Sequence, residues 1–136
     1  MSEVSAFFDT NVLLYLLSAD AAKADQAEAL LADTGVISVQ VLNEFAAVAS
    51  RKLGMAWPEI REVLGTARSM CRVESLTVAT HDRALGVAER YGFSVYDSLI
   101  VAAALLAGCD VLWTEDLQDD QRIEDQLTVK NPFARS

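Results

Sequence analysis

The amino-acid sequence predicts an α/β fold of three layers, α/β/α, in which a short central parallel sheet is flanked by helices. Short apolar runs rich in branched and aromatic residues alternate with longer segments of helical periodicity, a pattern typical of parallel β–α–β units. Two of these runs end directly at polar side chains, Asp9 and Thr114. With 136 residues and a hydrophobic fraction of 52%, the chain is expected to form a single domain, residues 1–136, around one core.

The first predicted strand, residues 4–8, is mostly apolar and stops at Asp9. In open α/β sheets, ligands bind outside the carboxyl ends of the strands, so Asp9 is a candidate for chemistry. Aspartate is also a favoured helix N-cap, and a helix is predicted to begin near Asn11. Both roles are therefore open for Asp9.

Two helical segments, residues 11–18 and 20–32, form either one broken helix or two, because strong helix formers and leucines recur at helical spacing. Gly35 then marks the turn into a second strand, residues 36–39. Together these segments form the first predicted β–α–β unit.

The next helix, residues 39–53, has an apolar stripe and a polar face that carries Gln40, Asn43 and Glu44. A solvated acid would be the ordinary interpretation of Glu44. However, a helix that leaves the second strand begins at the edge of the sheet where Asp9 ends the first. Glu44 is therefore a second candidate for the same crevice.

A helix over residues 57–70 begins with a proline in its first turn, and a short strand is predicted over residues 72–75. Thr77 caps the helix that runs to residue 90, and Gly92 ends it. This helix carries His81, the single histidine of the chain. A metal site built from several histidines of one subunit is thus excluded, and we interpret His81 as a surface residue.

Ser94 and Asp97 have the spacing of a capping box at the start of the next helix. Residues 99–107 of that helix are apolar nearly all round, so it is expected to be buried with its N-terminus against other structure. A carboxylate at that end, Asp97, is held rigidly. Capping alone would also explain it.

A buried strand over residues 110–114 ends in Thr114, Glu115 and Asp116, and a short last strand covers residues 127–129. The acid-rich segment between them, residues 115–125, is expected to be a solvated loop. That interpretation covers five of its acids: Glu115, Asp119, Asp120, Glu124 and Asp125. Asp116 stands apart because it follows a second strand end of the parallel sheet.

The net charge of −9 argues against broad, nonspecific nucleic-acid binding, because that affinity comes largely from Lys and Arg on phosphates. Metal ions held by the acids would supply local positive charge. A basic protein partner would also follow from the acidity. Small basic patches could come from four residues: Arg51, Lys52, Arg83 and Arg90.

Cys71 and Cys109 lack C-x-x-C spacing and a neighbouring histidine, so we expect reduced core thiols. No apolar run approaches the roughly 20 residues of a membrane helix. The N-terminal residues have no basic region ahead of an apolar segment. The sequence therefore predicts a soluble, cytoplasmic protein.

Taken together, four segments of the chain resemble the PIN-domain family, and within it the VapC-type ribonuclease toxins of toxin–antitoxin systems. Each segment alone is a weak signal, but their order and spacing are specific, and the resemblance covers nearly the whole chain. The segments are Phe-Asp-Thr-Asn-Val-Leu at 8–13, Asn-Glu-Phe at 43–45, Tyr-Asp-Ser-Leu-Ile-Val-Ala-Ala-Ala at 96–104, and Thr-Glu-Asp-Leu-Gln at 114–118 followed by Asn-Pro-Phe at 131–133.

The resemblance implies a metal-dependent endoribonuclease, the toxin of a type II pair, that uses Mg²⁺ or Mn²⁺ to cleave RNA. It also implies a cognate antitoxin with a basic segment, and a homodimer. Four residues match the acidic quartet of the family: Asp9, Glu44, Asp97 and Asp116. Two further residues, Asn11 and Thr114, match polar residues that line the same pocket.

Elementary electrostatics agrees with that expectation. Two unit charges about 5 Å apart repel by roughly 3 kcal/mol at an effective dielectric constant near 20, so clustered carboxylates need cations or protons. Hard divalent ions, which prefer oxygen ligands, would supply the positive charge that such a cluster of carboxylates needs. We expect Asp9 and Asp97 to bind a metal directly, Glu44 and Asp116 to bind it directly or through water, and a metal-activated water to attack the phosphodiester.

Two other functions are compatible with parts of the pattern. Haloacid-dehalogenase-like phosphatases also place an aspartate nucleophile after the first strand, but here Asn11 replaces the second aspartate and no matching lysine motif follows. The other is a non-catalytic acidic interaction module, since ligands alone do not establish catalysis. Loss of metal-dependent RNA cleavage on Asp9→Ala would separate these functions.

Overall fold

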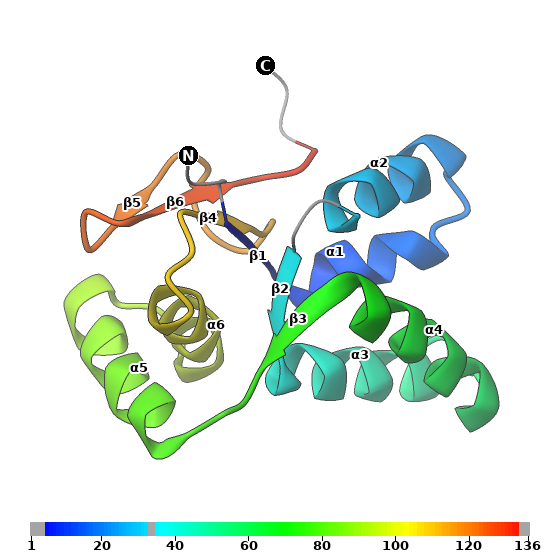
Figure 1. Ribbon diagram of the computed structural model, residues 1–136, viewed down its shortest axis with the longest axis horizontal. Coiled ribbons are helices and arrows are strands. Elements are labelled where there is room, and N and C mark those ends of the chain that lie inside the picture. The colour runs from blue at the N-terminus through cyan, green and yellow to red at the C-terminus, as the bar shows by residue number, and fades with distance from the viewer. Residues whose placement is uncertain (1–4, 33–34, 134–136) are drawn as a thin grey trace.

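The computed structural model describes residues 5–32 and 35–133, and its centre is one sheet with strand order β3-β2-β1-β4-β6-β5 (Figure 1). Neighbouring strands are parallel except for β5, which pairs antiparallel with β6 at the edge. The strands are β1 (Ala6–Phe8), β2 (Gly35–Ser38), β3 (Cys71–Glu74), β4 (Val111–Trp113), β5 (Arg122–Ile123) and β6 (Leu127–Lys130).

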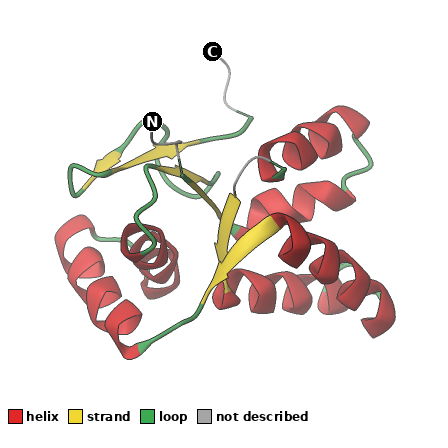
Figure 2. Ribbon diagram, viewed as in Figure 1, coloured by secondary structure: helices red, strands yellow, loops and turns green. Residues whose placement is uncertain are grey.

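Helices cover both faces of this sheet, which gives three layers (Figure 2). The pair α5 and α6 lies on one face, and the remaining helices lie on the other (Figure 1). The helices are α1 (Thr10–Leu14), the short 3₁₀ helix η1 (Tyr15–Leu17), α2 (Ala21–Leu31), α3 (Val39–Arg51), α4 (Trp57–Met70), α5 (Val78–Tyr91) and α6 (Val95–Leu106).

This architecture confirms the predicted α/β/α fold, with one exception in the sheet. The acid-rich segment 115–125 is not entirely a loop, because it contains β5. Three residues of that segment, Asp120, Glu124 and Asp125, have positive φ values of 67°, 55° and 54°, which allow the tight turns around so short a strand. β5 was not predicted because a strand of two residues is too short to show an alternating pattern in the sequence. Val4, the first residue of the first predicted strand, lies outside the described residues.

The helix boundaries follow the capping signals. The first helical region has two parts, α1 continued by η1 over residues 10–17 and α2 over residues 21–31, with a break at residues 18–20, which is one of the two arrangements that the sequence allowed. The hydroxyl of Thr77 accepts a hydrogen bond from the N–H group of Thr80, and Gly92 ends α5 with a φ of 75° in the left-handed region. The hydroxyl of Ser94 accepts from the N–H group of Asp97 at 3.1 Å. These predicted caps are confirmed.

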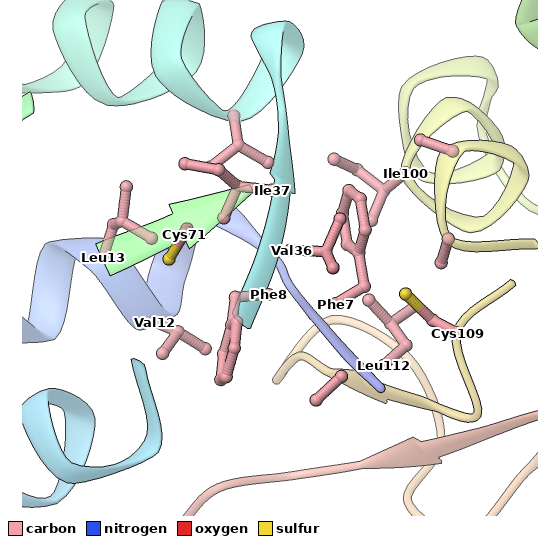
Figure 3. Packing of buried hydrophobic residues seen from close by; sticks show 14 of the residues in the cluster. Phe7, Phe8, Val12, Leu13, Val36, Ile37, Cys71, Ile100, Cys109 and Leu112 are labelled. Carbon is pink, nitrogen blue, oxygen red and sulfur yellow. The ribbon is translucent and has the colours of Figure 1, made fainter. Parts of the chain in front are cut away.

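The core is built on the two adjacent phenylalanines of β1, which point to opposite faces of the sheet (Figure 3). Phe7 packs with Ile100 and Leu112 on the side of α6 (Figure 3). Phe8 packs toward Val12 on the side of α1. Both rings are buried, so the last residues of β1 are fixed on two sides. Asp9, the predicted catalytic residue, follows directly and is therefore attached to a rigid part of the backbone.

The central helix α6 is buried along most of its length, as its continuous apolar sequence predicts. Its interior residues include Val101, Ala102 and Ala104, each with no exposed surface. Both cysteines, Cys71 and Cys109, are free and buried, in agreement with the interpretation as core thiols. Among the described residues, no helix combines the length and the apolar character needed to cross a membrane.

At Gly35 the backbone of β2 approaches the Phe8 ring so closely that a side chain does not fit, and this allows a test of the packing around β1. A methyl group at this position would lie 2.6 Å from the Phe8 ring and 3.2 Å from the Cys71 sulfur. Because the ring is buried and cannot move freely, Gly35→Ala is expected to lower the free energy of unfolding by about 1–3 kcal/mol. Urea denaturation measures this change.

Two helical glycines provide the matched control. Gly65 in α4 and Gly86 in α5 lie on exposed surface, and a methyl group added at either position would have no atom within 4 Å. Alanine there is expected to stabilise the protein by up to about 1 kcal/mol, because alanine is the better helix former. If Gly35→Ala were as stabilising as these controls, the close approach of β2 to Phe8 would be wrong.

Candidate active site

Asp9 lies at the end of the central strand and at the start of α1, and only 5% of its surface is exposed. One carboxylate oxygen accepts a hydrogen bond from the N–H group of Thr10 at 2.7 Å, which is the N-cap interaction of α1. The other oxygen accepts from the hydroxyl of Thr114, also at 2.7 Å. Asp9 is therefore a helix cap and, at the same time, a carboxylate fixed by two short bonds.

Burial raises the pKa of Asp9 from 3.8 to about 6. The bonds from Thr114 and Thr10 lower this pKa, whereas the negative charges of Asp116 and Glu44 raise it further. Desolvation is the largest cause. The side chain is thus a costly buried charge at neutral pH, and two of the other predicted acids lie close enough to act on it.

Thr114 joins the ends of two neighbouring strands. The register pairs Phe8 with Trp113, so the next residues, Asp9 and Thr114, lie side by side at the carboxyl edge of the sheet. The fully buried hydroxyl of Thr114 donates to Asp9 and accepts from the N–H group of Asp116 at 3.0 Å. This one hydroxyl therefore positions both carboxylate residues. Asp116 itself is exposed.

Glu44 reaches the same edge from the second turn of α3 and is half-buried. One carboxylate oxygen accepts from the hydroxyl of Thr10 at 3.3 Å, and the other accepts from the side-chain amide of Gln40 at 2.6 Å. Thr10 thus contacts two acids, Asp9 through its N–H group and Glu44 through its hydroxyl. The bonds fix Glu44 from both sides.

Asp97 approaches from the first turn of α6. Partial burial raises its pKa, the side chain of Ser94 lowers it, and the charge of Asp116 raises it. The carboxylate does not complete the predicted capping box, because only Ser94 caps the helix. The amide of Gln40 also donates to the backbone carbonyl of Tyr96 at 3.1 Å, which ties α3 to the start of α6. The start of α6, and Asp97 with it, is therefore held close to α3.

The four acids are consequently connected through hydrogen bonds or mutual repulsion, but they are not tightly clustered. Among the described residues, no three Asp, Glu, His or Cys side chains gather closely enough to enclose an ion by themselves. Glu44 lines a cavity together with Tyr96, whereas Asn11 lines a different cavity with Tyr15 and Glu115. An ion at Asp9 would therefore rely on one or two carboxylates and several waters, the arrangement that Mg²⁺ commonly has.

Buried polar atoms without a partner gather around this edge. Such atoms are rare in folded proteins and often mark functional positions. The described residues contain four: Asn11 Oδ1, Ser38 Oγ, Gln40 Oε1 and Ser98 Oγ. Ser38 ends β2, and Ser98 directly follows Asp97. These unpartnered oxygen atoms and the carboxylates are all oxygen donors, the type of ligand that a hard divalent cation prefers.

The sequence pattern predicts Gln40 on a polar helix face, yet Gln40 is 6% exposed and donates to the Glu44 carboxylate and to the backbone carbonyl of Tyr96. Thr10 was also not predicted as a link between two acids. The signals existed: Thr10 follows the capping acid directly, and Gln40 stands four residues before Glu44, on the same side of the helix. Their partners, however, come from distant parts of the chain, which spacing does not reveal.

Solved structures with the same fold include toxin–antitoxin proteins from several bacteria. A toxin–antitoxin complex from Klebsiella pneumoniae matches with a TM-score of 0.70 and 22% identity, over 94% of this chain and 98% of that one. DNA-bound VapBC from Salmonella typhimurium matches with a TM-score of 0.71 and 19% identity, over 96% of this chain and 99% of that one. VapC20 of Mycobacterium tuberculosis is described as a sarcin-ricin loop cleaving toxin. It matches with a TM-score of 0.66 and 22% identity, over 82% of this chain and 91% of that one.

At these identities the structural matches establish the fold. No curated protein sequence matches the chain. The family model of the PIN domain, however, matches residues 6–122, which is most of the chain and includes the positions of all four acids. The chain belongs to the PIN domain family.

Proposed function

We propose that this protein is a metal-dependent endoribonuclease and the toxin of a type II toxin–antitoxin pair. The observation that carries the proposal is the buried carboxylate of Asp9, held by Thr10 and Thr114 and influenced by the charges of Glu44 and Asp116. A buried acid with a raised pKa in a cluster of like charges is typical of functional sites. The similarity to a toxin that cleaves the sarcin-ricin loop supports RNA as the substrate class.

Asp9 and Asp97 are proposed to hold Mg²⁺ or Mn²⁺ directly, with Glu44 and Asp116 binding directly or through water. When bound, such an ion would stabilise negative charge on the phosphodiester and make a water molecule a stronger nucleophile. Other residues of the chain orient the carboxylates that would bind the ion. Thr114 and Thr10 keep the Asp9 carboxylate in one rotamer, and Gln40 does the same for Glu44. Such supporting bonds tune metal ligands in general.

The proposed partner is an antitoxin with a basic segment. The net charge of −9 and the acidic site favour a basic partner, and an arginine could bind a carboxylate of the site in bidentate fashion. It would neutralise the acids and compete with the ion. Several proteins of the same fold are described in complexes with antitoxins, which supports this class of partner.

Cleavage of single-stranded RNA in the presence of Mg²⁺ tests the activity. EDTA is expected to abolish it, and Asp9→Asn and Asp97→Asn are each expected to lower it at least about 100-fold, more than the loss of a supporting residue usually costs. Asp82→Asn, an exposed acid of α5, is the matched control and should retain activity. Cleavage that survives both EDTA and Asp9→Asn would contradict the proposal and leave Asp9 as a helix cap.

The pH dependence of stability gives an independent prediction. The pKa of Asp9 is higher in the folded state, so its contribution to stability is fully present below about pH 4 and is lost as the pH rises through about 6. This loss amounts to about 3 kcal/mol in the metal-free protein, since each pKa unit corresponds to about 1.4 kcal/mol. The neutral amide of Asp9→Asn would escape the loss but would disturb the bond with Thr114, a cost of about 1 kcal/mol.

Asp9→Asn is therefore expected to be more stable than the wild type at pH 7.5 and less stable below pH 4. Urea denaturation of both metal-free proteins at several pH values measures the crossing. Excess Mg²⁺ should stabilise the wild type more than the variant, because ligands stabilise the fold in proportion to their affinity. Parallel curves for the two proteins across this range would show that Asp9 carries no unfavourable charge.

A further inference from the structure

The turn after β4 is hydrogen-bonded to a tyrosine of the first helical region. The hydroxyl of Tyr15, the first residue of η1, donates to the carboxylate of Glu115 at 3.1 Å. The next residue, Asp116, bonds instead through its N–H group to the hydroxyl of Thr114, and the same hydroxyl donates to Asp9. Two neighbouring acids of one turn therefore have different partners.

The charges of these two acids also act on different groups. Burial is the largest cause of the raised pKa of both Asp9 and Asp97, and the charge of Asp116 adds to both shifts. Glu115 is not among the causes of either shift. The sequence predicts a solvated acid at this position, whereas Glu115 is half-buried and accepts from Tyr15. Of the two acids, only Asp116 therefore acts on the others of the site.

Tyr15 is itself fixed by the C-terminal part of the chain. The chain that leaves β6 runs toward α2 (Figure 1), and the ring of Phe133 packs on the ring of Tyr15 with 4.2 Å between their centroids. The ammonium group of Lys23, in α2, lies 5.5 and 5.7 Å from the two ring centroids. The side-chain amide of Gln26, also in α2, donates to the carbonyl of Pro132 at 2.5 Å. The ring of Tyr15 is therefore held in place.

The far end of the turn is bound to the same C-terminal segment. The N–H group of Asn131 donates to the carboxylate of Asp119 at 2.8 Å, and the side-chain oxygen of Asn131 accepts from the N–H group of Phe133 at 2.9 Å. Asp116 lies between Glu115 and Asp119, whose side chains are both bonded. Because its own side chain is exposed, the position of its carboxylate depends on the backbone of this turn.

We propose that Tyr15 is a positioning residue of the active site: by holding Glu115, it keeps the turn after β4 in the conformation in which Asp116 shares the Thr114 hydroxyl with Asp9. Phe133 contributes by holding the ring of Tyr15. The proposal rests on the proposed metal-dependent function, because Asp116 is a proposed ligand of the ion. Tyr15 acts through the turn and does not bind the ion itself.

The mobility of Asp116 in the metal-free protein tests this positioning without any reaction. NMR relaxation gives the order parameter of its backbone N–H group, which is about 0.85 for a rigid backbone and below about 0.6 for a flexible one. We expect a value near the rigid limit in the wild type and a clearly lower one in Tyr15→Phe, which loses the hydroxyl but keeps the ring. Phe133→Ala should lower it as well. An unchanged value in Tyr15→Phe would overturn the proposal.

Tyr91→Phe is the matched control. The hydroxyl of Tyr91 accepts from the N–H group of Glu124 at 2.9 Å, so this variant also removes a tyrosine hydroxyl that bonds to the acid-rich segment, but far from the turn after β4 in sequence. The order parameter of Asp116 should stay at its wild-type value. If Tyr91→Phe lowered it as much as Tyr15→Phe, loosening the segment anywhere would suffice, and the specific role of Tyr15 would be wrong.

The affinity for Mn²⁺, measured from the electron paramagnetic resonance of the free ion, tests the consequence for the site. Tyr15→Phe and Glu115→Ala should each weaken binding about fivefold, the effect of one hydrogen bond. Because both remove the same link, the double variant should bind like either single variant. Effects that instead multiply to about 25-fold would show that Tyr15 acts by a separate route, contrary to the proposal.

Glu115→Gln separates the position of this side chain from its charge. The amide oxygen of glutamine can still accept from the hydroxyl of Tyr15, whereas the negative charge is gone. The variant should therefore bind Mn²⁺ as the wild type does. Binding as weak as that of Glu115→Ala would mean that the charge of Glu115 attracts the ion, and positioning by Tyr15 would be rejected.

The proposed function can fail separately. A wild type that binds Mn²⁺ and cleaves RNA, with a Tyr15→Phe variant that binds Mn²⁺ equally tightly, would refute the role of Tyr15 and leave the nuclease intact. A wild type that neither binds Mn²⁺ nor cleaves RNA, while Asp116 is more mobile in Tyr15→Phe, would refute the metal-dependent nuclease. Tyr15 would then still be the residue that positions the turn.

Discussion

The structure depends on a buried carboxylate at the end of its central strand. Asp9 follows two phenylalanines that fill opposite faces of the core, so its position is fixed by packing. Its two oxygens are satisfied by Thr10 and Thr114, from the helix that follows and from the neighbouring strand. These bonds offset part of the cost of burial, and the pKa near 6 measures what remains. An ordinary helix cap at the surface would not carry this cost.

Other elements bring further acids to this edge, and two of these acids add to the cost. Glu44 comes from α3 and Asp97 from α6, whereas Thr114 and Asp116 lie in the segment that directly follows β4. Repulsion from Asp116 and Glu44 raises the pKa of Asp9. A fold stabilised only by its core would gain nothing from such repulsion. The proposed divalent ion would attract all of these carboxylates and offset their mutual repulsion. Metal binding would thus explain why the acids lie together, which helix capping does not.

The sequence predicted the elements better than the connections among them. Strand ends, caps and the buried α6 follow from local patterns, and Thr77, Gly92 and Ser94 cap as expected. β5 was missed because its two residues are defined only by pairing with β6. The links made by Thr10 and Gln40 were missed for a related reason. A hydroxyl or an amide acquires its role from partners about 34 or 56 positions away, which the fold alone brings near.

The location of a bound divalent ion decides whether Asp9 and the acids around it form one metal site. Mn²⁺ can be placed by anomalous scattering in crystals grown with this ion. We expect an ion bound to a carboxylate oxygen of Asp9, at about 2.1 Å as is usual for a small divalent ion, with Asp97 as a second ligand and waters completing the shell. Saturating Mn²⁺ that leaves Asp9 without an ion, or that binds only to the acids of residues 115–125, would contradict it.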